Sequence, residues 1–212
     1  EQIETYLLPT IRGERHDCLA MTEPNAGSDV RGMRTRAVRQ GDDYVINGSK
    51  HFISHADKSD FVVLFAATDV EETAHGPKKK ITGFLVDLDS PGLTVRRGPA
   101  CVSHRGYHQS ELFFSDCRVS VGNRLGEEGQ GFSFAMRGLD GGRINIATCS
   151  VGAAQGALEA SYTYMLERKQ FKQPLASFQA LQFKYADMAT HTVAARQMVR
   201  LAACKLDADS PD

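Results

Sequence analysis

The sequence lacks any apolar run close to the roughly 20 residues that a membrane-spanning helix needs. It also lacks an excess of one charge, because 25 basic and 26 acidic residues give a formal net charge of −1. A balance so close to zero leaves no electrostatic footprint for nucleic acid. We therefore expect neither a membrane partner nor a nucleic-acid partner.

Cysteine is scarce, with five residues and no CxxC pair. This odd count argues against a disulfide framework and a thiolate zinc site, and it suits a reducing compartment. His51 and His55 flank three residues of an expected strand, which would hold them about 13 Å apart. Gly106 separates His104 from His108 in an expected loop. The sequence thus predicts no metal site.

Signatures of two large enzyme classes are also missing. The chain contains no GxSxG elbow of the α/β-hydrolases and no GxxxxGK[ST] phosphate loop. The segment GEEGQG at 126–131 carries glycines but lacks the GxGxxG order and a preceding strand of a βαβ unit. We interpret it as a turn before a helix.

What is present falls into two parts that meet near residue 122. In the first part, short β-rich runs alternate with turn signals, at 16–21, 34–40, 44–46, 49–54, 61–68, 81–88, 93–97 and 111–114. This spacing predicts an antiparallel barrel or sandwich. Asn47-Gly48, between two of these runs, predicts a hairpin turn. The lysines at 78–80, beside Gly76-Pro77, predict a solvated loop.

The second part carries two helical patterns. Apolar residues recur every three or four positions from Ile144 to Met165 and from Leu181 to Leu206. Pro174 separates the two stripes, and Ser177 is the expected N-cap of the second helix. A short loop predicts antiparallel packing. Two helices cannot cover such stripes on all sides, so we expect partner helices from another subunit, from further sequence, or from both.

Both ends of the chain look like cuts within a longer sequence. Residues 2–11 look like the end of a helix running into Pro9, and residues 207–212 look like a loop. The first residue is Glu1 rather than Met, and no secretory signal is visible. We therefore expect an internal slice of a larger protein.

The stretch MTEPNAGSD at 21–29 places many short polar residues at the end of an expected strand. Thr22 and Ser28 offer hydroxyls, Pro24 stiffens the turn, and Asn25 to Gly27 permit a close backbone approach to a ligand. Such a segment can present backbone N–H groups to one extended polar ligand. From the spacing alone, a binding loop and an ordinary polar turn both remain open.

Six segments in order resemble the acyl-CoA dehydrogenase family. They are LAMTEPNAGSDV (19–30), YVINGSKHFIS (44–54), ELFFSDCRV (111–119), GEEGQGF (126–132), GLDGGRINIA (138–147) and ERKQFKQPLASFQALQ (167–182). The resemblance covers essentially the whole chain and is strongest to branched short-chain members. It implies an α+β fold with the end of an N-terminal helical domain at 1–15, a β domain at 16–121, and the first two long helices of a C-terminal helical bundle at 122–212.

The resemblance implies an FAD cofactor held by two segments of the β domain. The first would hold the pyrimidine edge of the flavin and, at Ser28, the junction between FAD and the thioester substrate. In the second, Phe52 would cover the flavin ring and the Ser54 hydroxyl would reach its N5 region. Many relatives carry Trp and Thr there, and Phe and Ser keep the stacking and one donor. The implied residues are Leu19, Ala20, Met21, Thr22, Ser28, Phe52, Ile53 and Ser54.

A further set of residues is implied to reach FAD from a neighbouring subunit. The Arg168 guanidinium suits bidentate pairing with the pyrophosphate, although without the resemblance it reads as an exposed arginine at a helix end. This set comprises Arg168, Gln170, Phe171, Phe178 and Gln179.

The acyl-CoA site is implied at residues Asp140, Gly141, Gly142 and Arg143, where the glycines would open the backbone to the pantetheine arm. Most family members carry the catalytic glutamate on a later segment, and a minority carry it at the position of Gly142. We therefore expect the catalytic base outside this chain.

The implied reaction is FAD-dependent α,β-dehydrogenation of an acyl-CoA thioester, with electrons passing to an electron-transferring flavoprotein. The family also implies a homotetramer, built as a dimer of dimers, in a bacterial cytoplasm or a mitochondrial matrix. Three alternatives remain open: an acyl-CoA oxidase that uses oxygen, a non-catalytic flavoprotein, and a fragment without activity of its own.

Overall fold

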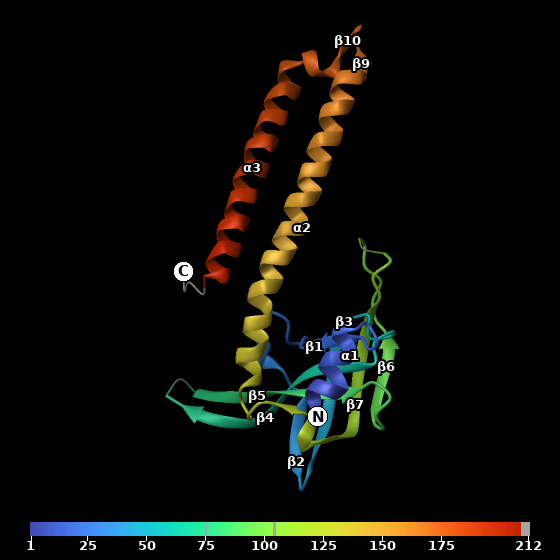
Figure 1. The fold of residues 1–212 in the computed structure, drawn as a ribbon, viewed down its shortest axis with the longest axis vertical. Helices are drawn as coiled ribbons and strands as arrows, with labels where there is room; N and C mark the ends of the chain where they lie inside the picture. The colour runs from blue at the N-terminus through green and yellow to red at the C-terminus, as the bar shows by residue number, and fades with distance from the viewer. Residues whose placement is uncertain (75, 104, 209–212) are drawn as a thin grey trace. The chain divides into compact units, whose positions relative to one another are not determined.

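Eight strands of the first unit, Glu1–Ala135, form one sheet in the computed structural model, which describes residues 1–74, 76–103 and 105–208 (Figure 1). The sheet order is β6-β7-β3-β2-β4-β5-β8, and β1 lies beside β4. The predicted α+β class is confirmed, although β1 and β2 run parallel to β4 where we expected antiparallel pairing. The strands are β1 (Asp17–Ala20), β2 (Arg36–Gln40), β3 (Asp43–Ser54), β4 (Phe61–Thr73), β5 (Gly76–Asp87), β6 (Leu93–Arg97), β7 (Gln109–Ser120) and β8 (Arg124–Leu125).

The core of this unit follows from the two-residue period of its strands. In β7, Ser110, Leu112 and Phe114 are buried and alternate with partly exposed residues. Leu112 and Phe114 join one apolar cluster with residues of the other strands, among them Ala20, Ile46, Leu64 and Phe84. Burial of one face therefore fixes the register of the sheet.

The predicted N-terminal helix is present and extends past Pro9. A π-helical turn, η1 (Ile3–Leu7), continues into α1 (Leu8–Ile11), and Pro9 stands in the first turn of this α-helical part. The Tyr6 ring packs edge-on against Phe61, with ring centroids 4.9 Å apart. This contact fixes the helix to β4.

The predicted hairpin at Asn47-Gly48 is wrong, because β3 runs straight through these residues. The turn lies at residues 41–42, and Gly48 has φ +146° where a Cβ would come within 2.6 Å of the Thr35 Cα. The Asn47 side-chain amide donates to Asp116 Oδ1 over 3.0 Å and accepts from the Asp116 N–H over 2.9 Å. The register with β7 shifts here, so the pair marks a β-bulge with a close strand approach.

The predicted solvated loop at the lysines 78–80 is also wrong. These residues belong to β5 and pair with the acidic end of β4. Lys79 Nζ donates to the Met33 carbonyl over 2.7 Å, and Lys80 Nζ lies 3.5 Å from Asp69 Oδ2. Opposite charges across the two strands stabilise a pairing that a run of lysines alone would disfavour.

Two long antiparallel helices make up most of the second unit, Met136–Asp212, as predicted (Figure 1). They are α2 (Gly131–Glu167) and α3 (Gln179–Asp207). The rings of Tyr162 and Tyr185 lie 5.5 Å apart, and Arg196 donates to Gln155 across the pair. Large apolar side chains remain exposed on both helices, including Ile146, Phe183, Val193 and Met198.

The junctions of these helices differ slightly from the predictions. The glycine-rich segment is indeed a turn, and α2 begins directly after Gln130. Short strands β9 (Lys169–Gln170) and β10 (Gln173–Pro174) join the helices. Ser177 ends a 3₁₀ turn, η4 (Leu175–Ser177), and Phe178 is the N-cap of α3, so the predicted serine cap is wrong. Of the predicted C-terminal loop at 207–212, Asp207 still belongs to α3, and residues 209–212 lie outside the described part of the chain.

Candidate functional site

The end of β1 and the middle of β3 lie side by side. The His51 N–H of β3 donates to the Thr22 carbonyl over 2.8 Å, just beyond the last residue of β1. In β1, Cys18 and Ala20 point into the core while the Leu19 side chain is 49% exposed. The first and second predicted flavin segments are therefore neighbours in space.

Phe52 is displayed on a bulge in β3. Lys50 pairs with Leu112 and Ile53 with Ser110, so two residues of β3 face one residue of β7. Phe52 has φ +57° and is 52% exposed, whereas Ile53 is buried. A left-handed backbone at a bulky residue costs about 1–3 kcal/mol and persists where the surrounding structure enforces it. The bulge turns an aromatic ring toward solvent at the end of β1.

A buried ion pair anchors the polar loop after β1. Lys50 Nζ lies 2.9 Å from Glu23 Oε1 and donates to the Met21 carbonyl over 2.9 Å. Glu23 also accepts from the N–H groups of Arg34, over 2.6 Å, and Thr35, over 3.0 Å. The side chains of Lys50 and Glu23 are only 0% and 5% exposed. One lysine therefore holds the loop against the sheet.

The electrostatics of this pair favour the ionised glutamate. Burial alone would raise the pKa of Glu23, but the charge of Lys50 and the hydrogen bonds to the carboxylate outweigh it and lower that pKa. Burial also lowers the pKa of Lys50, against the attraction of Glu23. The Met21 carbonyl is a further acceptor for the Lys50 ammonium group. Sequence reasoning missed this pair, whose partners are 27 positions apart.

The loop itself is short and well ordered by backbone contacts. Glu23 and Ala26 exchange backbone hydrogen bonds of 3.0 and 3.1 Å. Asp29 accepts from the Gly32 N–H over 3.2 Å and caps the short turn η2 (Val30–Gly32). Ser28 stands exposed between these two fixed points. These hydrogen bonds therefore hold the loop in place, while the Ser28 hydroxyl and the neighbouring backbone stay exposed.

Ser54 closes the β3 segment beside β7. Its hydroxyl is half-buried and accepts from Gln109 Nε2 over 3.5 Å. At the other end of the bulge, His51 Nδ1 lies 2.9 Å from Glu111 Oε1. The two ends of the bulge are therefore both tied to β7.

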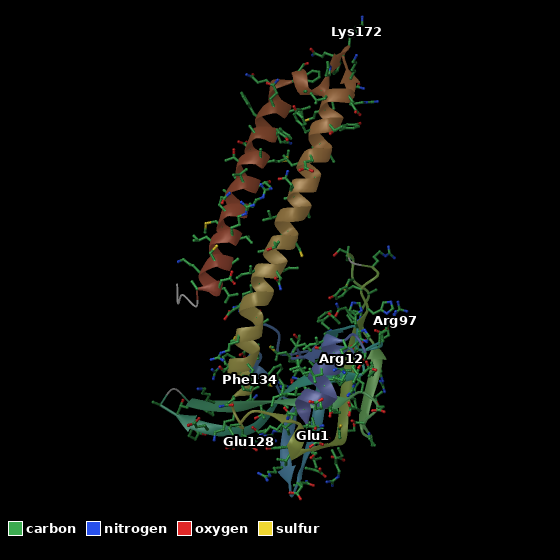
Figure 2. The ribbon with its side chains drawn as sticks, viewed as in Figure 1. Glu1, Arg12, Arg97, Glu128, Phe134 and Lys172 are labelled. Atoms are coloured by element: carbon green, nitrogen blue, oxygen red, sulfur yellow. The ribbon has the colours of Figure 1, made fainter. Side chains whose placement is uncertain are left out.

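The residues predicted to reach a neighbouring subunit's FAD gather at the α2–α3 junction. The Leu175 N–H donates to the Arg168 carbonyl over 2.8 Å, and the rings of Phe171 and Phe178 lie 6.3 Å apart. Phe171 is 87% exposed on the tip of the β9–β10 hairpin, next to Lys172 (Figure 2). Arg168, Gln170 and Gln179 are exposed in the same region.

The predicted acyl-CoA segment, residues 140–143, occupies about one turn of α2. Arg143 Nη1 and Asp140 Oδ1 form an ion pair of 2.8 Å across one turn. Nothing lies within 4 Å of a Cβ placed at Gly141 or Gly142. This stretch of helix therefore presents open backbone beside a fixed guanidinium.

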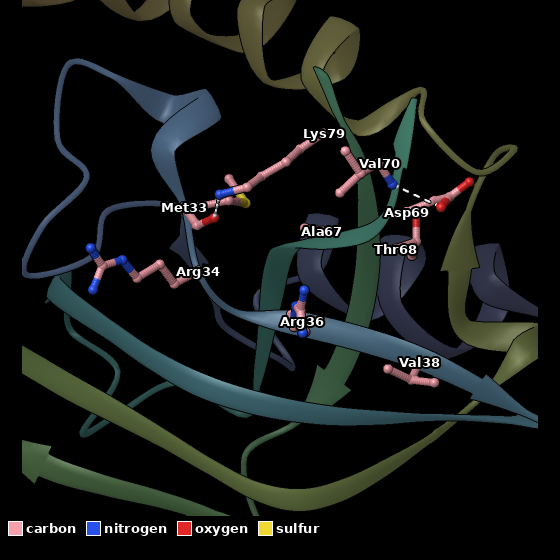
Figure 3. A pocket seen from close by; sticks show the side chains of 9 residues that line it. All are labelled: Met33, Arg34, Arg36, Val38, Ala67, Thr68, Asp69, Val70 and Lys79. Atoms are coloured by element: carbon pink, nitrogen blue, oxygen red, sulfur yellow. Dashed lines mark hydrogen bonds between the residues drawn. The ribbon is translucent and has the colours of Figure 1, made fainter. Parts of the chain in front are cut away.

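A cavity of about 600 Å³ opens where β2 and β4 part (Figure 3). Arg34 and Arg36 line it from the β2 side, and the Lys79 side chain crosses from β5 to the Met33 carbonyl (Figure 3). Sequence reasoning missed this opening, since it depends on two strands that pair only at Arg36 and Ala67.

The part of the chain that the structure describes shows neither a disulfide nor a cluster of side chains that could hold a metal ion. All five cysteines are unpaired, and the described residues contain no group of three metal-ligating side chains. In the first predicted histidine pair, His51 lies within β3 and His55 just beyond its end; His104 of the second pair lies outside the described residues. None of the described helices is long and apolar enough to span a bilayer.

The β1 and β3 segments fit a flavin by their own geometry. They combine an exposed ring on an enforced bulge, an exposed aliphatic side chain at Leu19 and the hydroxyls of Thr22 and Ser54. A flat, amphipathic ring system needs this mixture of apolar cover and polar edge contacts.

Comparison with known proteins gives the same family for both parts of the chain. The acyl-CoA dehydrogenase middle-domain model matches residues 18–117, and the C-terminal-domain model of that family matches residues 129–212. The mitochondrial isobutyryl-CoA dehydrogenase of Dictyostelium discoideum is 45% identical over 100% of this chain and 50% of its own length. The caffeyl-CoA reductase-Etf complex subunit CarC of Acetobacterium woodii is 44% identical over 98% of this chain and 54% of its own length.

The solved structures agree with the sequence comparisons. Butyryl-CoA dehydrogenase from Megasphaera elsdenii superimposes with a TM-score of 0.90 and 39% identity over 99% of this chain and 54% of that one. The chain thus spans about half the length of the relatives it matches. With both domain models and the fold in agreement, the chain belongs to the acyl-CoA dehydrogenase family, a family of flavoprotein oxidoreductases.

Proposed function

We propose that this chain forms the flavin cradle of an FAD-dependent enzyme that introduces a double bond between Cα and Cβ of an acyl-CoA thioester. The observation that carries the proposal is the exposed, strained Phe52 beside the end of β1. Its segment converges with Thr22 through the His51 hydrogen bond. An exposed ring in a disfavoured backbone conformation is best explained by a ligand that it covers.

The residues of the cradle would divide the work of binding. The Leu19–Thr22 backbone and the Thr22 hydroxyl would hold the polar edge of the flavin, while Phe52 covers the ring and excludes water. Ser54 would direct its hydroxyl to the reactive edge, and Ser28 would meet the substrate. Bound FAD supplies the two-electron acceptor for the substrate's β-hydrogen.

The second unit would complete the site in an oligomer. Arg168 carries a positive charge suited to a pyrophosphate, and Gln170, Phe171, Phe178 and Gln179 lie around it. We propose a homotetramer in which these residues approach the FAD of another subunit. The apolar side chains exposed on α2 and α3 support such an assembly, because their burial stabilises subunit contacts.

The substrate end would involve Asp140, Arg143 and the open helix surface at Gly141 and Gly142. Gly142 has no side chain and cannot remove the α-proton, so we place the general base outside these 212 residues. The isobutyryl-CoA and butyryl-CoA dehydrogenases among its relatives favour a short, branched or straight acyl group.

We propose an electron-transferring flavoprotein as the electron acceptor, since a relative at 44% identity is named as a subunit of an Etf complex. Oxygen is the alternative acceptor, as in an acyl-CoA oxidase. Turnover of the full-length enzyme with each acceptor separates the two. The relatives come from bacterial and mitochondrial sources, and we propose a bacterial cytoplasm or a mitochondrial matrix as its location.

The first experiment is a visible spectrum of the purified chain with FAD, followed by anaerobic addition of isobutyryl-CoA and butyryl-CoA. We expect a bound-flavin spectrum that stays oxidised, because the cradle is present and the base is not. Absence of bound flavin would contradict the cradle. Bleaching by substrate would show that a base lies within the chain.

A further inference from the structure

A separate cavity of about 400 Å³ lies beside the paired ends of β6 and β7. Arg97 and Ser110 face each other in the register of these strands, and Arg96 comes from the same end of β6. Residues that the flavin proposal does not use line this space, among them Arg96, Arg97, Arg105, His108 and Ser110. The cavity therefore needs an explanation of its own.

The hydroxyl of Ser110 is the most informative group in this cavity. Ser110 is 1% exposed, and its Oγ has no hydrogen-bond partner among the described residues. Buried hydroxyls are almost always paired in folded proteins, because an unpaired one loses its bonds to water without replacement. An unpaired donor at the wall of a cavity indicates a ligand that accepts from it.

The charge of the cavity indicates the kind of ligand. Three arginines line it, Arg96, Arg97 and Arg105. One carboxylate, that of Asp57, also lines the cavity, where its Oδ2 lies 2.6 Å from His108 Nδ1. Glu111 pairs with Arg96 in the register, and its Oε1 lies 2.9 Å from His51 Nδ1. The Arg96 guanidinium lies 4.9 Å from the centre of the Phe113 ring, on the face of the two strands opposite Ser110. Arg97 and Arg105 are therefore the arginines that can serve a ligand at the hydroxyl. An excess of fixed positive charge remains.

We infer that this cavity binds a small oxyanion of the phosphate class. Guanidinium groups pair with phosphate oxygens in bidentate fashion, and a phosphate has enough oxygens to accept from Ser110 at the same time. A single carboxylate offers two oxygens for two arginines and the hydroxyl, and so satisfies fewer of these donors. The inference uses none of the side chains assigned to the flavin, although Ser110 pairs with Ile53 in the register of β3 and β7.

The test titrates inorganic phosphate into the full chain at constant ionic strength and follows binding by calorimetry. Ser110→Ala should weaken phosphate binding about tenfold, because a hydrogen bond to a charged group is lost. Arg97→Gln should weaken it at least as much. Arg39→Gln removes the same charge from exposed β2 and should change the affinity less than about twofold.

Two results would overturn the inference. If Arg39→Gln weakens binding as much as Arg97→Gln, the affinity for phosphate depends only on the net charge of the chain and not on this cavity. If neither Arg97→Gln nor Ser110→Ala weakens binding, the cavity is not the site. The melting temperature without phosphate gives an independent check: Ser110→Ala should raise it, because an unpaired buried hydroxyl disappears. A fall would mean that the hydroxyl is already satisfied within the protein.

Discussion

Replacing Lys50 by Met should destabilise the first unit by about 3–5 kcal/mol at pH 7, because it leaves the Glu23 carboxylate buried without its counter-charge. Methionine has a similar volume, so loss of packing contributes little. The matched control is Lys80→Met, which breaks a surface pair of 3.5 Å with a 42% exposed lysine. That pair should contribute no more than about 1 kcal/mol.

The pKa of Glu23 determines how the destabilisation caused by Lys50→Met changes with pH. In the native chain the pKa of Glu23 is lowered, so its stabilising contribution is complete above the ordinary value of 4.5 and is lost as pH falls through the lower folded value. Without Lys50, burial alone raises that pKa, and the carboxyl takes up a proton at mildly acidic pH. The stability gap between the native chain and Lys50→Met should therefore narrow from pH 7 to pH 5.

Urea unfolding at both pH values measures this gap, and Glu23→Gln completes a double-mutant cycle. The double variant should be less destabilised than the sum of the single variants, since the unpaired charge is gone. Lys50→Met should also weaken FAD binding, because the Met21 carbonyl loses its donor. A gap that is the same at both pH values, or equal destabilisation by Lys80→Met, would refute the reasoning.

Three further outcomes are expected. Gly48→Ala should cost more than about 3 kcal/mol in urea unfolding, because the new Cβ meets backbone at 2.6 Å, whereas Gly156→Ala in α2 should be neutral or stabilising by up to about 1 kcal/mol. Phe52→Gly should lower FAD affinity in a fluorescence titration while changing the melting temperature little, because relief of the strained φ offsets the lost contacts; a large fall in melting temperature would contradict this. Arg168→Gln should weaken FAD binding by the oligomer about tenfold or more, while Lys172→Gln should not; equal effects would point to net charge alone.

Periodic segments were predictable from the sequence, and close strand approaches were not. The stripes from Ile144 and Leu181 predicted α2 and α3 because the helical period is local and repeats over many turns. Asn47-Gly48 matches the local pattern of a turn, but the glycine serves the contact with Thr35, which no local pattern reveals.

The features of the candidate site likewise fall into those that the sequence predicted and those that it did not. The residues from Leu19 to Ser28 and from Phe52 to Ser54 were identified through family motifs, and their role in flavin binding stays a prediction. The Glu23–Lys50 pair and the cavity at Ser110 were not found, because each joins strands distant in sequence. An acid after a buried strand, together with a lysine in the interior of another strand, is the signal by which the pair could have been found.

The parallel pairing of β1 with β4 has a consequence for the order of folding. Asp17 pairs with Phe61, and the His16 N–H bonds to Asp60 Oδ2 across 44 positions of the chain. Contacts of such high sequence separation carry a large loop-closure cost and usually form after the local hairpins. The loop at 21–29 follows the end of β1, so we expect it to form after β4 has paired with β5. In refolding experiments, flavin capture should therefore follow the main gain of β structure rather than accompany it.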